Sequence, residues 1–294
     1  MCPERLRVWS EYLAMKRRLC NLANLALASA LFLAAAVQAN PAQETLALVL
    51  KAYIDRQRLA GPLPHLAIAK AIEVQDFLVM NLAPDYGSVA GYQRDSGYGG
   101  SLLSTVLLEN MFTTSGATLH RARDCNPLVE LELLVRVGSE QINKADTLAT
   151  VAAQISEVLP AVEVRDQLLV ATQRLDSAAL IAINGGVRYL VLGRPLVVPL
   201  SITVDDWAGV FAAHLFQKDG TIVSHGRGLV SGTGPLQAVL ELKQLLQKRG
   251  RFLKAGDLLA LGSVGFAVEP DTTGRFEASF ETPFGSGRVV FALR

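Results

Sequence analysis

The stretch "NPLVELELLVRV", Asn126 to Val137, combines a run of Leu and Val with two glutamates. Its apolar, β-branched character predicts a buried strand. Residues two apart on a strand point to the same face, so Glu130 and Glu132 lie side by side. Two like charges this close on a mostly apolar strand repel each other. A shared proton, a bound cation or a solvated strand face would each make the pair tolerable.

A third acid, Glu163, lies in "LPAVEVRD" (159–166), which is another short strand-like apolar run. A divalent ion between neighbouring carboxylates removes their mutual repulsion. All-oxygen ligands suit Mg²⁺, Mn²⁺ or Ca²⁺ better than zinc or copper. Spacing alone does not join Glu163 to the pair, and a solvated face is the simpler interpretation of the spacing.

The part of the chain before Asn126 is expected to be mainly helical. Residues 41–59 and 63–84 have helical apolar spacing, whereas a Gly- and Tyr-rich stretch over 85–101 is expected to form a pocket loop. The segment "SLLSTVLLENMF" (101–112) is ambiguous between helix and strand. We therefore expect an N-terminal helical region over 40–125 and a β-rich domain over 126–294.

The second part is expected to be rich in antiparallel strands. The pattern predicts a helix over 145–160 that Pro160 stops, a hairpin over 207–228 with Asp219-Gly220 at its turn, and a helix that Gly250 closes. Alternating strands finish the chain. Strands of this kind with a few helices predict the α+β class.

The N-terminus predicts a secretory signal over residues 1–39. Basic residues after Met15, the expected real start, precede an apolar run over 22–37, and cleavage is expected after Ala39. The run is short for a membrane span, which needs about 20 apolar residues. We therefore expect an exported protein, periplasmic or secreted, without a stable membrane anchor. Only Cys125 would then remain, which excludes an intrachain disulfide and a thiolate zinc cluster.

Charge and histidine usage exclude other classes of function. The formal net charge of +1 gives no chain-wide electrostatic reason to hold nucleic acid. The four histidines lack metal-ligand spacing, although His120 lies in a loop shortly before the glutamate pair. The Gly-rich stretch over 226–237 lacks the spacing of a nucleotide loop and is expected to be a strand-to-helix turn.

Several motifs in order resemble the fumarylacetoacetate hydrolase superfamily, and within it the 2-keto-4-pentenoate hydratase and 4-oxalocrotonate decarboxylase branch. The resemblance runs from about Gly91 to the C-terminus. It rests on these motifs: "MFTTSGATL" (111–119), "NPLVELELLVRV" (126–137), "LPAVEVRD" (159–166), "INGGVRYLVLGRP" (183–195) and "GPLQAVLELKQLLQKRGRFLKAGDLLALGS" (234–263).

The resemblance implies a β-rich mixed-sheet roll after a small helical region, and frequent homo-oligomers. It also implies that Glu130, Glu132 and Glu163 bind one Mg²⁺ or Mn²⁺ ion. That ion would chelate a small 2-oxo or 2-hydroxydienoic acid and stabilise its enolate. The substrate-contacting residues that it implies are Tyr92, Asn184 and Ser263.

The chain departs from the branch at the expected acid/base group. "GYQRD" (91–95) has Gln93 where the branch has a lysine, and an amide cannot shuttle protons. Asp95, Tyr92 or His120 would have to replace that lysine. Further departures are Thr233-Gly234-Pro235 in place of Gly-His-Pro, and Val264-Gly265 after the Gly-Ser turn.

Three functions therefore stay open. The first is a metal-dependent lyase, hydratase-like or decarboxylase-like, acting on a small oxo acid. The second is a catalytically altered relative that binds metal and an oxo acid without turnover. The third is a hydrolase of 1,3-diketones such as acylpyruvates, which needs an activated water near Glu163. An ionisable side chain beside the metal, on the Gln93 side, would favour an enzyme.

Overall fold

The computed structural model describes residues 41–59, 61–96, 100–120, 127–166, 168–169, 176–209, 211–229, 232–270 and 273–294. These residues all lie in the compact unit Pro41–Arg294. The expected signal over 1–39, with Met15, lies outside the described residues, so export stays a prediction. Asn126 and Cys125 lie outside them too, and the division at 126 also stays a prediction. Among the helices that the structure describes, none has the length and apolar content needed to cross a bilayer.

Two sheets form the body of this unit. The larger one has eight strands in the order β2-β1-β11-β5-β6-β7-β3, with β8 paired to β6. Its strands are β1 (Val89–Ser96), β2 (Leu102–Leu108), β3 (Phe112–Thr114), β5 (Pro127–Val137), β6 (Ile155–Asp166), β7 (Val187–Leu192), β8 (Leu196–Val197) and β11 (Leu258–Ser263).

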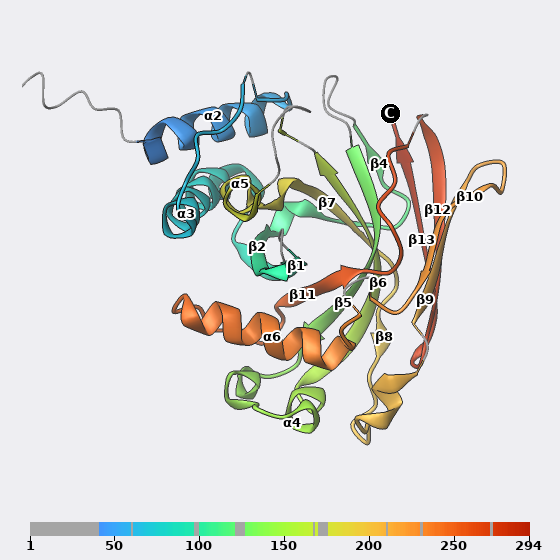
Figure 1. Cartoon of the computed structure of the whole chain (residues 1–294). Helices are drawn as coiled ribbons and strands as arrows, with labels where there is room; N and C mark the ends of the chain where they lie inside the picture. Colours follow the sequence, from blue (N-terminus) through green and yellow to red (C-terminus); the bar gives the residue numbers. More distant parts are fainter. Residues whose placement is uncertain are drawn as a thin grey trace, which may run out of the picture. The chain divides into compact units, whose positions relative to one another are not determined.

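The second sheet has five strands in the order β10-β9-β12-β13-β4. Its strands are β4 (Thr118–Leu119), β9 (Ala212–Gln217), β10 (Ile222–Arg227), β12 (Gly274–Thr282) and β13 (Gly285–Leu293). The helices are α2 (Pro41–Asp55), α3 (Ile68–Tyr86), α4 (Leu148–Ala152), α5 (Ser177–Ala182) and α6 (Pro235–Lys248). The five-stranded sheet packs beside β5, β6 and β7, while α2, α3, α5 and α6 lie on the other side of the larger sheet (Figure 1).

The strand predicted over 126–137 is confirmed as β5, which pairs with β6 along its whole length. The antiparallel register runs from Pro127 opposite Asp166 to Arg136 opposite Glu157. The Leu and Val side chains of β5 are nearly all buried. Burial on both faces explains why its apolar residues form a run and do not strictly alternate.

Two expectations of secondary structure need correction. The helix predicted over 145–160 is limited to α4, and residues 155–160 belong to strand β6. Pro160 lies where the partner of β6 changes from β8 to β7, a position that tolerates a residue without an N–H group. The expected pocket loop over 85–101 contains strand β1 over 89–96. The ambiguous stretch over 101–112 contains β2.

The α+β class and the β-rich roll are confirmed. Helices α2 and α3 fall in the two segments with helical spacing, and α6 ends just before Gly250, whose φ is 69°. The hairpin β9–β10 turns at Gly220, with a φ of 85°. Strand β1 joins the sheet by parallel pairing to β11, with Gly91 beside Leu258. A Cβ atom at Gly91 would lie 2.0 Å from the carbonyl oxygen of Leu258, so only glycine permits this approach.

A buried ion pair between Arg188 and Asp166 connects α2 to the larger sheet. Arg188 on β7 is 3% exposed, and its Nε donates to Asp166 Oδ2 at 2.5 Å. Its Nη1 donates to the carbonyl oxygen of Tyr53 at 2.6 Å, and its guanidinium lies 3.7 Å from the centre of the Tyr53 ring. The charge of Arg188 is therefore satisfied by one strand and one helix together.

Replacing Arg188 by Met should lower the free energy of unfolding by about 3–5 kcal/mol, because Asp166 would be left buried without its partner. The same change at Arg194, an exposed residue of the following loop, should cost less than about 0.5 kcal/mol. Denaturant unfolding measures both variants. Equal stability of the two would show that the buried pair does not hold α2 in place.

Candidate metal centre

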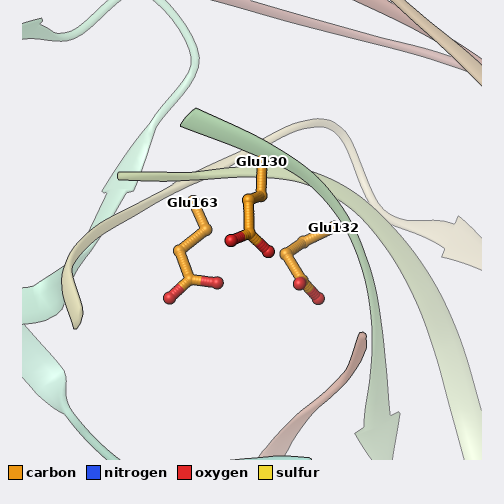
Figure 2. A group of neighbouring side chains, drawn as sticks. All are labelled: Glu130, Glu132 and Glu163. Atoms are coloured by element: carbon orange, nitrogen blue, oxygen red, sulfur yellow. The ribbon is translucent and has the colours of Figure 1, made fainter. Parts of the chain in front are cut away.

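Neighbouring antiparallel strands bring the three glutamates together. Glu130 on β5 is directly opposite Glu163 on β6, and Glu132 is one step further along the same face. One carboxylate oxygen from each residue lies within 4.8 Å of the others. Figure 2 shows the three side chains leaving their strands toward one common space. The register therefore joins Glu163 to the pair, which spacing in the sequence did not do.

The cluster is deeply buried, and this changes its proton affinity. The side chains of Glu132 and Glu163 are 0% exposed. Burial raises the pKa of Glu163 to about 8, against the opposing effect of the Arg165 guanidinium. Burial also raises the pKa of Glu132 well above its usual range, and the charges of Glu163 and Glu130 add to that effect. Without a cation, the cluster therefore holds protons that a surface glutamate would release.

Side chains from β1 and β6 surround the cluster. The Gln93 amide Nε2 donates to Glu163 Oε2 at 2.6 Å. Arg165, two residues after Glu163, places its Nε 2.8 Å from Glu163 Oε1 and its Nη2 2.8 Å from Asp95 Oδ1. Asp95 also accepts from Thr105 Oγ1 at 2.6 Å. In sheet order, β11 and β5 separate β1 from β6, so the curl of the sheet brings Gln93 across to Glu163.

The cluster opens into a cavity of about 330 Å³. Its lining residues are Arg94, Asp95, Ser96, Glu130, Glu132, Arg165, Gly262 and Ser263. Arg94 is neutralised by Glu241, with Nη2 and Oε2 2.8 Å apart. The backbone N–H of Gly262 donates to Glu132 Oε2 at 3.3 Å. Gly262 has a φ of 121° and lies beside a register shift in the β11–β5 pairing. The cavity is large enough for a small organic acid and carries negative charge at its base.

The donor set fits a hard divalent cation. Glu132 Oε1 and Glu163 Oε1 are buried and have no hydrogen-bond partner among the described residues. Buried carboxylate oxygens without partners are costly unless a cation or a proton meets them. Carboxylate oxygens are the ligands that Mg²⁺, Mn²⁺ and Ca²⁺ prefer. Glu130, Glu132 and Glu163 are thus the residues that could hold such an ion.

The structure brings some of the other predicted residues to this cavity and not the rest. Gln93, Asp95 and Ser263 are at the site. Tyr92 points to the opposite face of β1, with its ring 5.9 Å from the Arg251 guanidinium. Asn184 is buried and exchanges hydrogen bonds with the backbone of Val106, away from the cavity lining. His120 is exposed directly after β4 in the other sheet.

Sequence reasoning missed Arg165, the guanidinium closest to the cluster. A signal for it was present, because Arg165 is two residues after Glu163 and must share its strand face. Thr105 and Gly262 carried no comparable signal, since their roles arise from strand register, of β1 with β2 for Thr105 and of β11 with β5 for Gly262. The pairing of Asp95 with Arg165 likewise depends on the curl of the sheet.

The chain has similarities to known proteins, although no family model matches it. It is 25% identical over 187 residues to 2-keto-4-pentenoate hydratase 2 of Dechloromonas aromatica (strain RCB), which covers 64% of this chain and 69% of the relative. Its structure is similar to 4-oxalocrotonate decarboxylase from Pseudomonas putida G7 complexed with magnesium and adipate. That match has a TM-score of 0.70 and 20% identity, over 86% of this chain and 98% of the other.

A weaker structural match is a fumarylacetoacetate isomerase/hydrolase, described as putative, from Oleispira antarctica. Its TM-score is 0.50 at 12% identity, over 69% of this chain and 92% of the other. These matches agree with the two-sheet roll. The protein has a fumarylacetoacetate hydrolase-like fold, and its sequence is similar to those of 2-keto-4-pentenoate hydratase and 4-oxalocrotonate decarboxylase.

Proposed function

We propose that the protein is a divalent-metal-dependent lyase, hydratase-like or decarboxylase-like, that acts on a small 2-oxo or 2-hydroxydienoic acid. Mg²⁺ or Mn²⁺ would be held by Glu130, Glu132 and Glu163. In such reactions a proton, water or carbon dioxide leaves or joins the carbon chain, and negative charge develops on an oxygen of the substrate. A bound divalent ion would supply the positive charge that stabilises this oxygen. The relatives that support this proposal are named for such substrates.

The observation that carries the proposal is an ionisable group beside the cluster on the Gln93 side. Asp95 lines the cavity, is two residues after Gln93 on β1, and is the carboxylate among the described lining residues that does not belong to the cluster. Its Oδ1 and Oδ2 are held by Arg165 and Thr105, so the carboxylate has a fixed orientation. A group so placed can take a proton from a bound acid and return it at another carbon.

The other lining groups would orient the acid. Ser263 borders the cavity next to Glu132, where its hydroxyl can donate to an oxygen of the ligand, whereas the Gly262 N–H is already donated to Glu132. Gln93 donates to Glu163 and so fixes the direction of that carboxylate, without itself moving a proton.

Gln93 also favours the second function, a relative that binds metal and an oxo acid without turnover. Gln93 occupies the position at which the resembled branch has a lysine, and its amide donates a hydrogen bond that holds Glu163 in place. Catalysis would then depend on Asp95 alone.

A panel of 2-oxopent-4-enoate, 4-oxalocrotonate and acylpyruvates, tested with Mg²⁺ or Mn²⁺, decides between these functions. We expect turnover of an unsaturated oxo acid that stops when the metal is chelated. Asp95→Asn should lower kcat by about 10²-fold at saturating metal, because it removes the acid/base group. Metal-dependent binding without turnover would support the binding protein, and turnover restricted to acylpyruvates would support a hydrolase.

A further inference from the structure

We propose that Arg165 is a tethered cation that competes with the divalent ion for the glutamate cluster, and thereby sets how tightly that ion binds. The proposal rests on the metal site of the proposed function. In this view Arg165 offsets the cluster's charge while the site lacks a metal. Binding of the ion then requires the guanidinium to give up Glu163.

The position of Arg165 follows from strand geometry. It is two residues after Glu163 on β6, and it is opposite Leu128, two residues before Glu130 on β5. Its side chain therefore projects from the same face as the cluster. Its Nε lies 2.8 Å from Glu163 Oε1 and 3.6 Å from Glu130 Oε1. Two of the three ligand carboxylates thus already have a cation beside them, and it is covalently part of the chain.

The contact with Glu163 is close but poorly directed. Arg165 Nε and Glu163 Oε1 are both buried, and neither has a partner that meets hydrogen-bond geometry among the described residues. The attraction between them is therefore mainly that of two charges, without the alignment that strengthens an arginine–carboxylate pair. A contact of this quality can be exchanged for a metal–oxygen bond at small cost.

The other end of the guanidinium is held firmly. Nη2 donates to Asp95 Oδ1 at 2.8 Å, and Thr105 holds the second oxygen of Asp95. Arg165 and Asp95 both line the cavity and are each 14% exposed, so the guanidinium has room to move off the cluster. Asp95 can keep Arg165 in the cavity after the contact of Arg165 with Glu163 has been exchanged for a metal ion.

Two effects of opposite sign follow from this arrangement. A positive charge within a few ångströms of the metal position weakens cation binding, so its removal should strengthen it. The same removal should destabilise the metal-free protein, because Arg165 is the arginine among the described lining residues that lies within ion-pair distance of the cluster, whereas Arg94 is paired with Glu241. A residue that merely supported the fold would not raise metal affinity when it is replaced.

The test is calorimetric titration of Mn²⁺ into the metal-free full chain, with thermal melting of the same samples. Arg165→Gln should bind Mn²⁺ at least about tenfold more tightly than the natural protein. Its metal-free melting temperature should fall by roughly 5 °C, and Mn²⁺ should restore it. The charge-keeping Arg165→Lys should stay within about threefold of the natural affinity.

Arg136→Gln is the matched control. Arg136 pairs with Glu157 across the same two strands, at their far end from the cluster. Its loss removes the same charge from the same strand pair, so the Mn²⁺ affinity should not change. Asp95→Asn should weaken Mn²⁺ binding more in the natural chain than in the Arg165→Gln background, because in the natural chain Asp95 acts both directly on the cluster and through Arg165.

The outcomes separate this proposal from the metal site itself. Unchanged or weaker Mn²⁺ binding by Arg165→Gln, while the natural protein binds Mn²⁺, overturns the tethered cation and leaves the metal site intact. No binding by either protein overturns the metal site and the tethered cation together. If metal-free Arg165→Gln unfolds, refolding by Mn²⁺ supports the proposal, and a chain that stays unfolded with Mn²⁺ overturns it.

Discussion

Changing Glu130 and Glu132 together to Gln should abolish the binding of Mg²⁺ and Mn²⁺. Both carboxylates lie within 4.8 Å of a Glu163 oxygen, and the amide that replaces each one carries no charge. Glu163 alone, with Arg165 beside it, cannot hold a divalent ion. We expect the dissociation constant to rise by at least about 10²-fold, measured by calorimetry on the purified protein.

The matched control is a pair of Glu→Gln changes outside the cavity, at Glu157 in the end of β6 far from the cluster and at Glu277 on β12. Each of these glutamates is paired with an arginine far from the cluster, and the double variant should bind metal as the natural protein does. Metal affinity that survives the change at Glu130 and Glu132 would mean that the ion is held elsewhere. The melting temperature gives a second readout, because the change removes buried charge and should not unfold the metal-free chain.

Metal ions should stabilise the protein far more at alkaline than at mildly acidic pH. Burial raises the pKa of Glu163 to about 8 in the metal-free fold. A raised pKa means that the fold binds a proton that the unfolded chain has already released at neutral pH. This stability is fully present below the unfolded pKa of the glutamate and is lost as the pH rises through about 8. The raised pKa of Glu132 acts in the same direction.

At alkaline pH the metal-free cluster is therefore charged and costly, and a divalent ion removes that cost. At about pH 6 the ion must first displace protons, so its effect is small. We expect Mg²⁺ to raise the melting temperature by only about 1–2 °C near pH 6 and by more than about 8 °C near pH 9. Melting curves with and without Mg²⁺ across this range measure the effect. A shift that does not grow with pH would show that the ion does not bind the buried glutamates.

The apolar content of β5 was enough to predict its strand, and the period of two was enough to put Glu130 and Glu132 on one face. The position of Glu163 relative to them depends on strand register, which pairing between two separate segments sets. Sequence spacing contains no such information, and only the family resemblance supplied the third residue. The structure then gives the direct pairing of Glu130 with Glu163.

Strand β1 and the helix predicted over 145–160 show where local patterns fail. The Gly and Tyr content of β1 is typical of a loop, and its strand state comes from pairing with β2 and β11. Residues 155–160 have an apolar pattern that suits either state, and the long partner β5 decides it. In both cases tertiary pairing overrides local preference, which is why Asp95 could not be placed beside Arg165 beforehand.

The parallel pairing of β1 with β11 also constrains when the site can be completed during synthesis. All three glutamates lie in β5 and β6, which are neighbours along the chain and can pair early. Gly91 can pair with Leu258 only late in synthesis, because β11 begins 92 residues after β6 ends. The β5 edge of this acidic strand pair therefore has no partner in the larger sheet until β11 has been made, and the glutamates stay more accessible to water than in the finished fold.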